Sequence, residues 1–381
     1  MRKKMVYTLK HFDTDLLRFS ANANSSTPGY KIVWADEDKK TLLPKDLELS
    51  EKGLESWVRR RSIPKNRAFV DSFLAKCGLS ANRPLGIISV SKGLSLNDCY
   101  WVVEEGFDGT FENYNLYDNR FSAVLGRIAF TGYGSSVRAS FASSPEFTTN
   151  GMLPKCWRRI NGSIVLYKGG TSGASNTGFE PYSEFYAHQV AEALGIQSVS
   201  YGLSKWKGAI CSTCALFTTK KVSYVPAGKI VPEGGFDAVV AFYRSLGGAF
   251  EKSLADMLVL DAVIKNTDRH YGNFGFLLDS RTNTIIAPAP LFDHGNSLYS
   301  LAGPGDFDSR ESLADYDRSL LPCVYDRFVE TAKACMTQWH KDRLRGILRF
   351  RFTRHPRYNV PRQRLSAIES QIRSNAALLL R

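Results

Sequence analysis

The sequence lacks long hydrophobic runs. No stretch approaches the roughly 18 consecutive apolar residues that a membrane helix needs. The opening segment, MRKKMVYTLKHFDTD, has a basic start but no apolar segment behind it of the kind that a secretory signal carries. We therefore expect no membrane partner and no export, and a protein that stays in the cytoplasm.

The sequence also lacks a regular arrangement of cysteines. The seven cysteines are odd in number and scattered, which argues against a disulfide framework and fits a reducing compartment. Cys211 and Cys214 form a C-x-x-C, but no second pair or histidine cluster lies near it in the sequence to complete a zinc site. We expect both to be small side chains of the strand ICSTCALF.

Acidic residues are fewer than basic ones, which gives a net charge of +13. Such an excess suits an acidic partner, either nucleic acid, an acidic protein or nucleotide phosphates. Part of it lies in Arg59–Arg61 and in the run RLRGILRFRFTRHPRYNVPRQR, neither of which carries a zinc-finger, RNP or zipper pattern. Solvated basic faces explain these runs more simply, and a nucleic-acid partner stays open.

Internal repeats are absent, and a hydrophobic content of 43% with 23% charged residues is ordinary for a folded globular chain. We expect three parts: an N-terminal subdomain over 1–130, a nucleotide-binding lobe over 131–220 and a helical catalytic lobe over 221–381. In the first part, KKMVYTLKHFD alternates like an edge strand and KIVWADED predicts a second strand. LPKDLELSEKGLESWVRRR and NRAFVDSFLAKCGL have helical apolar spacing.

The second part opens with a serine- and threonine-rich stretch from Ser135 to Thr149, which predicts a flexible entry. Asn161-Gly162 between two alternating runs is a strong hairpin signal. EPYSEFYAHQVAEALGI predicts a helix, with Pro181 in its first turn and Gly195 at its end. The segment YGLSKWKGAICSTCALFTT predicts further strands.

The third part is largely helical. FDAVVAFYRSL, KSLADMLVLDAVIK and PRQRLSAIESQIRSNAALLL have helical apolar spacing, and FGFLLD-SRTN-TIIAPA predicts a hairpin between the second and third of these. The last helix would place Leu365, Ile368, Ile372 and Leu379 on one face.

The densest polar cluster lies between an apolar helix and that hairpin. It runs from Asn266 to Asn273 (NTDRHYGN), and the hairpin leads on into the segment PLFDHG, which contains Asp293. A helix, a polar loop with Asp and Asn five apart, a short hairpin and a second Asp are the parts of a kinase catalytic lobe in their usual order.

The chemistry of phosphoryl transfer explains why these residue types recur in this order. The reaction needs positioning and charge neutralisation more than covalent help. Asp268 would orient the hydroxyl nucleophile and accept its proton, while Asn273 and Asp293 would supply oxygen ligands to Mg²⁺. The alternative is that Asp268 and Asn273 merely cap turns. For His270 we expect a structural role in the loop rather than that of a general base.

The second part offers a matching nucleotide side. Lys168 ends the strand SIVLYK, where it would contact the α- and β-phosphates of ATP, and Glu184 on the following helix would hold it by an ion pair. Taken alone, a lysine at the end of a strand or a glutamate on a helix is also compatible with an ordinary exposed side chain.

Two further segments complete the nucleotide side. Backbone N–H groups of Thr149, Asn150 and Gly151 would face phosphate, although the loop is neither a Walker A motif nor a G-x-G-x-x-G. Phe217 and Thr218 follow the strand CALF, where a hinge between lobes would contact adenine.

These motifs resemble those of the HipA-like protein kinases of bacteria. NTDRHYGNFGFLLD followed by APLFDHGNSL is similar to that family's catalytic and metal loops, and TTNGMLPKCW, IVLYKGG and SEFYAHQVAEALGI match its nucleotide side in order. The resemblance covers about residues 130–300. It implies an α+β, two-lobed protein-kinase-like fold with an additional N-terminal α/β subdomain and a largely helical C-terminal lobe.

By the same resemblance, Lys168 would contact ATP, Asp268 would be the catalytic aspartate, and Asn273 and Asp293 would hold Mg²⁺. The substrate would be Ser or Thr of a protein, and some members are toxins with an antitoxin partner. Some members autophosphorylate in the phosphate loop, where this chain has Thr148 and Thr149 but lacks the Gly-Ala-Gln of the best-known toxin branch.

Two other functions stay open. One is a lipid or small-molecule kinase on the same fold, since the D-R-H-x-x-N string is also similar to that of phosphoinositide kinases. The other is a non-catalytic regulator that binds nucleic acid. The joint presence of Lys168, Asp268, Asn273 and Asp293 argues against a pseudokinase.

Overall fold

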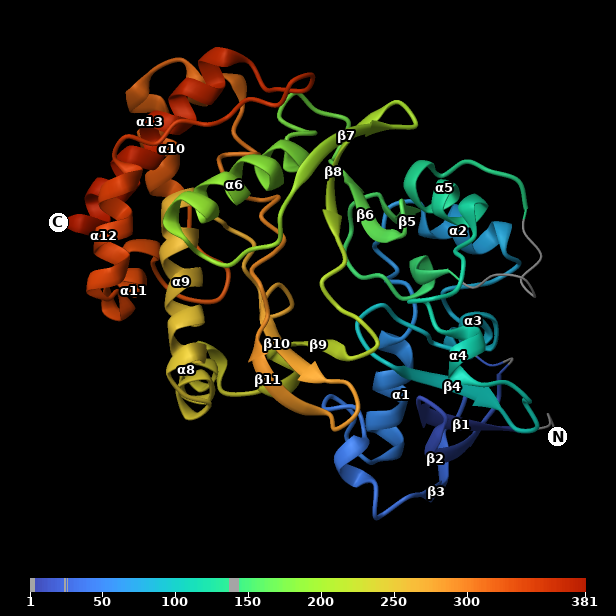
Figure 1. The fold of residues 1–381 in the computed structure, drawn as a ribbon. Coiled ribbons are helices and arrows are strands. Elements are labelled where there is room, and N and C mark those ends of the chain that lie inside the picture. The colour runs from blue at the N-terminus through green and yellow to red at the C-terminus, as the bar shows by residue number, and fades with distance from the viewer. Residues whose placement is uncertain (1–3, 24, 26, 137–143) are drawn as a thin grey trace. The chain divides into compact units, whose positions relative to one another are not determined.

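The computed structural model describes residues 4–23, 25, 27–136 and 144–381. Its backbone forms two compact units, each assembled from separate stretches of chain. Unit one comprises Met1–Lys168, Leu216–Val225 and Leu277–Ile286, and unit two comprises Gly169–Ala215, Pro226–Phe276 and Ala287–Arg381. Figure 1 labels the elements described below. The three functional parts expected over 1–130, 131–220 and 221–381 remain a prediction.

An antiparallel four-stranded sheet opens unit one, in the order β3-β2-β1-β4. Its strands are β1 (Met5–His11), β2 (Thr14–Ala21), β3 (Lys31–Ala35) and β4 (Tyr100–Glu104). The expectation of an edge strand in the first segment is wrong, because β1 pairs with both β2 and β4. Strand β2 was not expected, since its buried neighbours Leu16 and Leu17 break the alternation of a half-buried strand.

The helices of unit one are α1 (Glu51–Arg60), α2 (Val70–Lys76), α3 (Pro84–Ser91), α4 (Phe111–Tyr114) and α5 (Ala123–Thr131). Arg61, at the end of α1, corrects the expectation of a fully solvated basic run. Its guanidinium is buried and binds both carboxylate oxygens of Asp98, at 2.6 and 2.9 Å. The Arg59–Arg61 run is therefore partly a structural element of the N-terminal subdomain.

Two hairpins expected from the sequence are present. Strands β5 (Lys155–Ile160) and β6 (Ser163–Gly169) pair antiparallel around Asn161 and Gly162, whose φ angles of +49° and +83° fit a type I′ turn. Strands β10 (Gly275–Asp279) and β11 (Thr284–Pro288) form the second, in a sheet of order β11-β10-β9 with β9 (Val222–Pro226).

Unit two begins with α6 (Glu180–Leu194), followed by the antiparallel strands β7 (Gly202–Trp206) and β8 (Ala209–Ala215). The expected helix signals are confirmed: Pro181 lies in the first turn of α6, and Gly195 ends the helix with a φ of +69°. Cys211 and Cys214 lie on β8, in the strand expected from the sequence.

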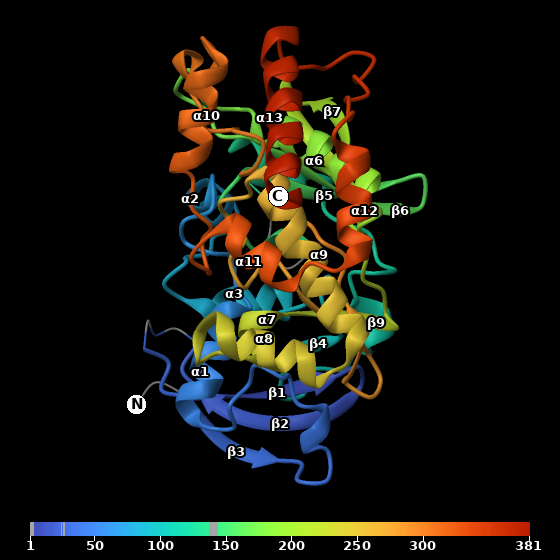
Figure 2. The same ribbon diagram turned by 90° about the vertical axis from the view of Figure 1, so that its left-hand side faces the viewer.

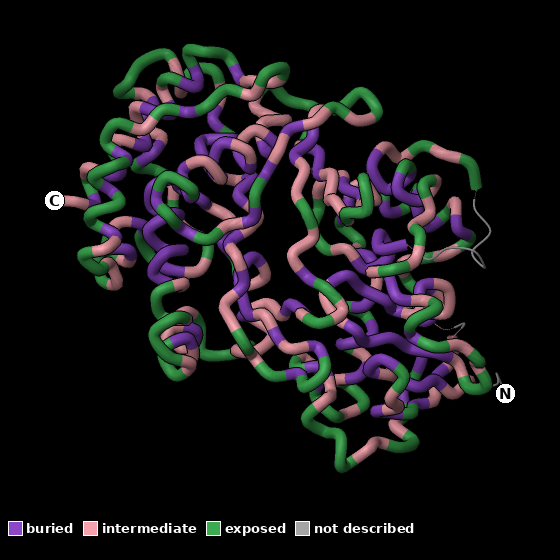
Figure 3. Tube along the Cα trace, in the orientation of Figure 1, coloured by how far each residue is buried: buried purple, intermediate pink, exposed green. Residues whose placement is uncertain are grey.

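The rest of unit two is helical. Its helices are α7 (Ala227–Ile230), α8 (Gly235–Ser245), α9 (Gly248–Ile264), α10 (Arg310–Ser319), α11 (Phe328–Cys335), α12 (Gln338–Ile347) and α13 (Arg362–Leu380). Every residue of α9 from Leu254 to Ile264 is buried, and Figure 2 shows α11 and α13 beside it. The purple tube in Figure 3 traces this buried stretch.

Helix α13 presents the apolar face expected from its spacing, with Leu365, Ile368, Ile372 and Leu379 buried. Because α9 is buried on all sides from Leu254 to its end, it fixes the position of the loop that follows it. Within the described part of the chain, no helix combines the length and the apolar character needed to cross a membrane.

Candidate active site

The expected catalytic loop, residues 266–273, belongs to unit two and lies between α9 and β10 in the chain. Helix α9 ends at Ile264, and the next residue, Lys265, adopts a left-handed φ of +53°. The Asp268 N–H donates to Asn266 Oδ1 at 3.2 Å, and Asn273 Nδ2 donates to the Asp268 carbonyl at 3.0 Å. Because its amide nitrogen is used within the loop, Asn273 has its Oδ1 as the side-chain oxygen for another ligand.

The segment expected to hold metal, residues 292–297, is bound directly to this loop; we call it the metal loop. Asn296 Nδ2 donates to Asp268 Oδ2 at 3.1 Å, and the Thr267 N–H donates to the Asn296 carbonyl at 3.1 Å. The structure therefore brings the predicted catalytic aspartate and the predicted metal segment together. Asn296 was not among the residues predicted from the sequence.

Arg269 connects the catalytic loop with the metal loop. One guanidinium nitrogen donates to the carbonyls of Asn273 and Phe292, at 3.0 and 2.6 Å, and a second is 3.0 Å from His294 Nδ1. The same side chain makes a two-point contact with Asp261 of α9, and neither partner has any side-chain exposure. Arg269 thus positions Asn273 itself and the two neighbours of Asp293, the other expected metal ligand.

Burial and charge act in opposite directions on this arginine. Burial lowers the pKa of Arg269, and the neighbouring Asp261 carboxylate raises it to a net value above the ordinary one. The guanidinium therefore stays charged. A signal for this role existed in the sequence: an aspartate inside the apolar helix DMLVLDAVI needs a buried partner, and Arg269 follows eight residues later.

His270 makes a structural contact within the loop, as expected from the sequence. Its Nδ1 accepts the Gly272 N–H at 3.0 Å. This hydrogen bond stabilises a local turn, which is a structural role.

Asp293 occupies a constrained backbone position in the metal loop. Its φ is +57°, and its N–H donates to the Tyr201 hydroxyl at 3.0 Å. The next N–H, of His294, donates to Glu184 Oε2 at 2.8 Å. A non-glycine residue in the left-handed region persists only where its surroundings hold it, and such residues concentrate at functional sites.

Glu184 therefore supports the metal loop, through a contact that the sequence did not indicate. It is fully buried on α6. Its expected ion pair with Lys168 remains a prediction.

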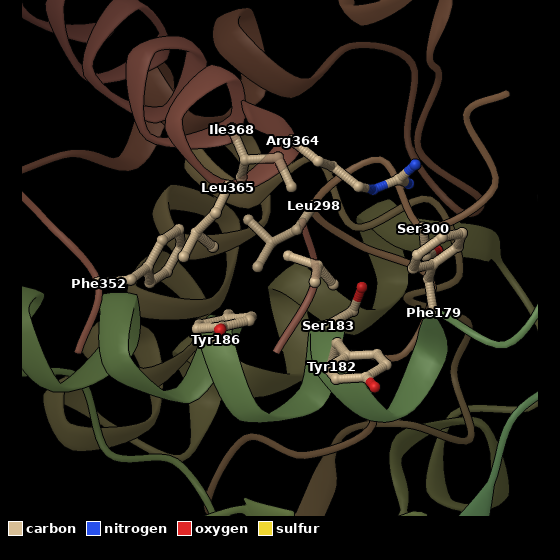
Figure 4. Close-up of a pocket in the computed structure, with 11 residues that line it drawn as sticks. Phe179, Tyr182, Ser183, Tyr186, Leu298, Ser300, Phe352, Arg364, Leu365 and Ile368 are labelled. Atoms are coloured by element: carbon tan, nitrogen blue, oxygen red, sulfur yellow. The ribbon is translucent and has the colours of Figure 1, made fainter. Parts of the chain in front are cut away.

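Helix α6 is itself fixed by packing within unit two. The Ser183 hydroxyl donates to the Ser297 carbonyl at 2.9 Å, and Figure 4 shows Ser183 and Tyr186 of α6 facing α13 across a small, mostly apolar pocket. The pocket is lined by Phe179, Tyr182, Ser183, Tyr186, Leu298, Ser300, Phe352, Val360, Arg364, Leu365 and Ile368. This packing fixes the helix that carries Glu184.

The expected phosphate loop belongs to unit one. Thr149 is largely used within the loop itself: its N–H and its hydroxyl both donate to the Pro145 carbonyl, at 3.0 and 2.7 Å, and its hydroxyl also accepts from Trp157 Nε1 at 3.1 Å. The phosphate-facing role expected of this loop is therefore better suited to the N–H groups of Asn150 and Gly151.

Lys168 and the expected adenine segment also lie in unit one. Lys168 is buried near the end of β6. Phe217 packs edge-on against Tyr224, with ring centroids 5.5 Å apart, and the Thr218 hydroxyl donates to the Leu96 carbonyl. The Thr218 side chain is thereby occupied, so a contact of this residue with adenine would come from its backbone.

The candidate oxygen ligands fit Mg²⁺ that is bound together with a nucleotide better than they fit a metal ion held by protein side chains alone. Within the described ranges, no group of three or more His, Cys, Asp or Glu side chains gathers in a metal-binding arrangement. Mg²⁺ commonly takes one or two protein oxygens and completes its shell with phosphate and water. Asn273 and Asp293 match that requirement.

The arrangement of an apolar helix, a catalytic loop, a hairpin and a metal loop is that of a protein-kinase-like catalytic lobe. No family model matches the chain. In sequence the chain is 29% identical over 135 residues to the serine/threonine-protein kinase CtkA of Helicobacter pylori, a match that covers 32% of this chain and 41% of CtkA. The chain thus matches about two fifths of the length of that relative.

Solved structures extend the comparison to the fold. A chain of the Shewanella oneidensis toxin–antitoxin complex of HipA, HipB and operator DNA matches 97% of this chain and 96% of its own length, with a TM-score of 0.51 and 13% identity. The Helicobacter pylori proinflammatory kinase CtkA matches 61% of this chain and 92% of its own, with a TM-score of 0.48 and 16% identity.

These findings confirm the expected α+β kinase-like fold and the resemblance to the HipA-like serine/threonine kinases, by fold and by distant sequence similarity. The individual site residues remain predictions.

Proposed function

We propose that this chain is an ATP- and Mg²⁺-dependent kinase that phosphorylates Ser or Thr of a protein substrate. The observation that carries the proposal is the joining of the two loops by Arg269 and Asn296. Arg269 binds the carbonyls of Asn273 and Phe292, and Asn296 binds the Asp268 carboxylate. A loop pair fixed in this way supplies the positioning on which phosphoryl transfer depends.

Each site residue then has a role. Asp268 orients the acceptor hydroxyl and takes its proton. Asn273 and Asp293 would hold Mg²⁺, which supplies neutralisation of phosphate charge. Lys168 binds the nucleotide phosphates, and Glu184 supports both the metal loop and, by our prediction, Lys168.

The test is phosphorylation of a mixed protein substrate pool by the purified chain, followed by phosphosite mapping. The proposal expects Mg²⁺-dependent modification of Ser and Thr, with none in the Asp268→Ala variant. Phosphorylated lipid or small molecules in place of protein would favour the alternative kinase class instead.

The Shewanella structure supports a narrower proposal about partners. That complex contains HipB and operator DNA as well as HipA. We propose an antitoxin-type partner for this chain. Because the net charge of +13 favours acidic partners, we also propose nucleic acid as a second binding partner. Co-purification with the products of adjacent genes, followed by binding to their upstream DNA at several salt concentrations, tests both.

Autophosphorylation at Thr148 or Thr149 is also part of the proposal, with Ser143 and Ser144 as weaker acceptors. Ser143 lies outside the described residues. The Thr148 hydroxyl is buried and donates to the Leu94 carbonyl at 2.7 Å. Modification at Thr148 or Thr149 therefore requires the loop to open, and the added charge of roughly −1.5 to −2 would keep it open.

A further inference from the structure

Two residues that border the candidate site share a backbone conformation that residues with a side chain rarely adopt. Lys265 directly precedes the catalytic loop and has a φ of +53°, and Tyr299 lies two residues after the metal loop and has a φ of +58°. A left-handed conformation in a non-glycine residue persists only where the surrounding structure holds it. The contacts that hold these two residues therefore also limit how the two loops can move.

The two loops are paired through their backbones next to these residues. The Leu298 N–H donates to the Ile264 carbonyl at 2.8 Å, and in each partner the following residue is the left-handed one. The Thr267 N–H donates to the Asn296 carbonyl at 3.1 Å, directly before Asp268. A shift of either bordering residue would therefore be passed on to the catalytic aspartate.

The side chains of both left-handed residues converge on one carboxylate, that of Asp317 on α10. Lys265 Nζ lies 3.2 Å from Asp317 Oδ2, and the Tyr299 hydroxyl donates to Asp317 Oδ1 at 2.6 Å. All three side chains are buried. Interactions of a charged group are stronger where water is excluded, and removing one partner leaves the other as an unpaired buried charge.

Helix α13 completes the network around this carboxylate. Asn375 Nδ2 lies 3.0 Å from Asp317 Oδ1, 3.2 Å from the Tyr299 hydroxyl and 3.2 Å from the Val263 carbonyl. The Tyr299 carbonyl is held as well, because Arg364, labelled in Figure 4, donates to it at 2.7 Å. A buried polar network whose members are bonded to one another makes its surroundings rigid.

Helix α10 uses little of its own surface for packing. Of its ten residues, Leu313 and Asp317 are the two that are buried. An aspartate is rarely buried without a specific partner, and an apolar side chain would attach the helix at least as well. The aspartate is therefore explained by what it binds, the two residues that border the loops.

We propose that Asp317 is a positioning residue of the kinase site, which holds the catalytic loop through Lys265 and the metal loop through Tyr299. The inference rests on the proposed function and deepens it. Asp317 acts through these two residues and does not contact the reacting atoms. By keeping both in the left-handed conformation, it sets the placement of Asp268 relative to the expected metal ligands, on which phosphoryl transfer depends.

The test compares Asp317→Asn with the wild-type chain in kcat, in the Mg²⁺ concentration that gives half-maximal rate, and in affinity for ADP without Mg²⁺. The variant leaves Lys265 unpaired, so kcat should fall about 10- to 100-fold, the size expected for a small misplacement of reacting groups. The Mg²⁺ requirement should rise. ADP affinity should stay within about twofold, because the proposed phosphate contacts of Lys168 and Gly151 lie outside the network.

Tyr299→Phe covers the case that Asp317→Asn does not fold. It keeps the ring and both charges and removes one hydrogen bond to the carboxylate, so kcat should fall about 3- to 10-fold. Asp315→Asn is the matched control. It makes the same change on the same helix at a carboxylate whose side chain is 70% exposed and pairs with Arg318, and its kcat should match that of the wild-type chain.

A kcat within about twofold of the wild-type value in Tyr299→Phe, and in Asp317→Asn where it folds, would overturn the assignment. So would a loss of ADP affinity as large as the loss of kcat, because it would indicate general disruption of the fold. In either case the kinase proposal would survive on the turnover of the wild-type chain. A wild-type chain without turnover would overturn both.

Discussion

Arg269 and Asp261 form a two-point ion pair, at 3.0 Å for each contact, with no exposed surface on either side chain. The pair links the last turns of the buried helix α9 to the loop that carries Asp268. A buried pair of this kind adds little net stability compared with a well-packed apolar pair, but breaking it is costly because one charge is left alone. Its value here is in fixing the loop geometry.

We predict that Asp261→Asn lowers the free energy of unfolding by about 3–5 kcal/mol and strongly reduces activity, because Arg269 loses its buried counter-charge. Glu251→Gln is the control, since it breaks the exposed pair between Glu251 and Arg244 and should cost less than about 1 kcal/mol. Urea unfolding of the three proteins measures the difference. Equal losses in the two variants would contradict the role given to the buried pair.

We predict that Asp268→Ala and Asp293→Ala each abolish phosphoryl transfer while the fold is retained. Both act on the same transition state, so the double variant should be no worse than the more damaging single one. Turnover assays with circular dichroism as the folding control decide this. A variant with near-wild-type turnover would show that its residue is not in the site.

We predict a strong loss of ATP use in Lys168→Met and a smaller one in Glu184→Gln. Lys168 would touch phosphate, whereas Glu184 supports the metal loop through the His294 N–H, and a glutamine can still accept that bond. Nucleotide affinity and kcat of the two variants provide the measurement. A silent Lys168→Met would place the phosphates elsewhere.

We predict a pH-dependent effect for Glu146, which is fully buried beside the phosphate loop. Burial raises its pKa, partly opposed by hydrogen bonds from the Ser144 hydroxyl and the Trp157 N–H. A carboxyl whose pKa is raised on folding contributes stability that is complete below its unfolded pKa of about 4.3 and is lost as pH rises through the folded value.

Glu146→Gln removes this dependence. Relative to the wild-type chain, the variant should therefore gain stability as pH rises above the unfolded pKa of about 4.3, by about 1–3 kcal/mol for one buried carboxylate. Urea midpoints at several pH values test the sign, with the exposed Glu233→Gln as the control for loss of one charge. A gain toward acid pH would show that the carboxylate is stabilised as the anion.

The elements predicted correctly from the sequence are those with strong local signals. The Asn161-Gly162 turn requires left-handed backbone, and α6 carries both of its end signals, so neighbouring residues decide these structures. Strand β1 was misjudged as an edge because its partner β4 follows about ninety residues later, and pairing at that distance leaves no local pattern.

The sequence supplied candidates for the reacting groups of the site, but not the residues that hold the two loops in place. Asp268 and Asp293 belong to an order of motifs that can be read along the chain. Arg269 and Glu184 hold the metal loop, and Asn296 joins it to Asp268, through contacts that span 23 to 110 positions in sequence. Such long-range bonds depend on tertiary packing, which residue type and spacing alone do not specify.

The most direct test of the kinase assignment is ATP turnover by the purified chain, with and without Mg²⁺, followed by intact-mass analysis. The wild-type chain should consume ATP only when Mg²⁺ is present, and Asp293→Ala should consume none. ATP consumption that is unchanged by Mg²⁺ removal or by Asp293→Ala, or its absence in the wild-type chain, would contradict the assignment.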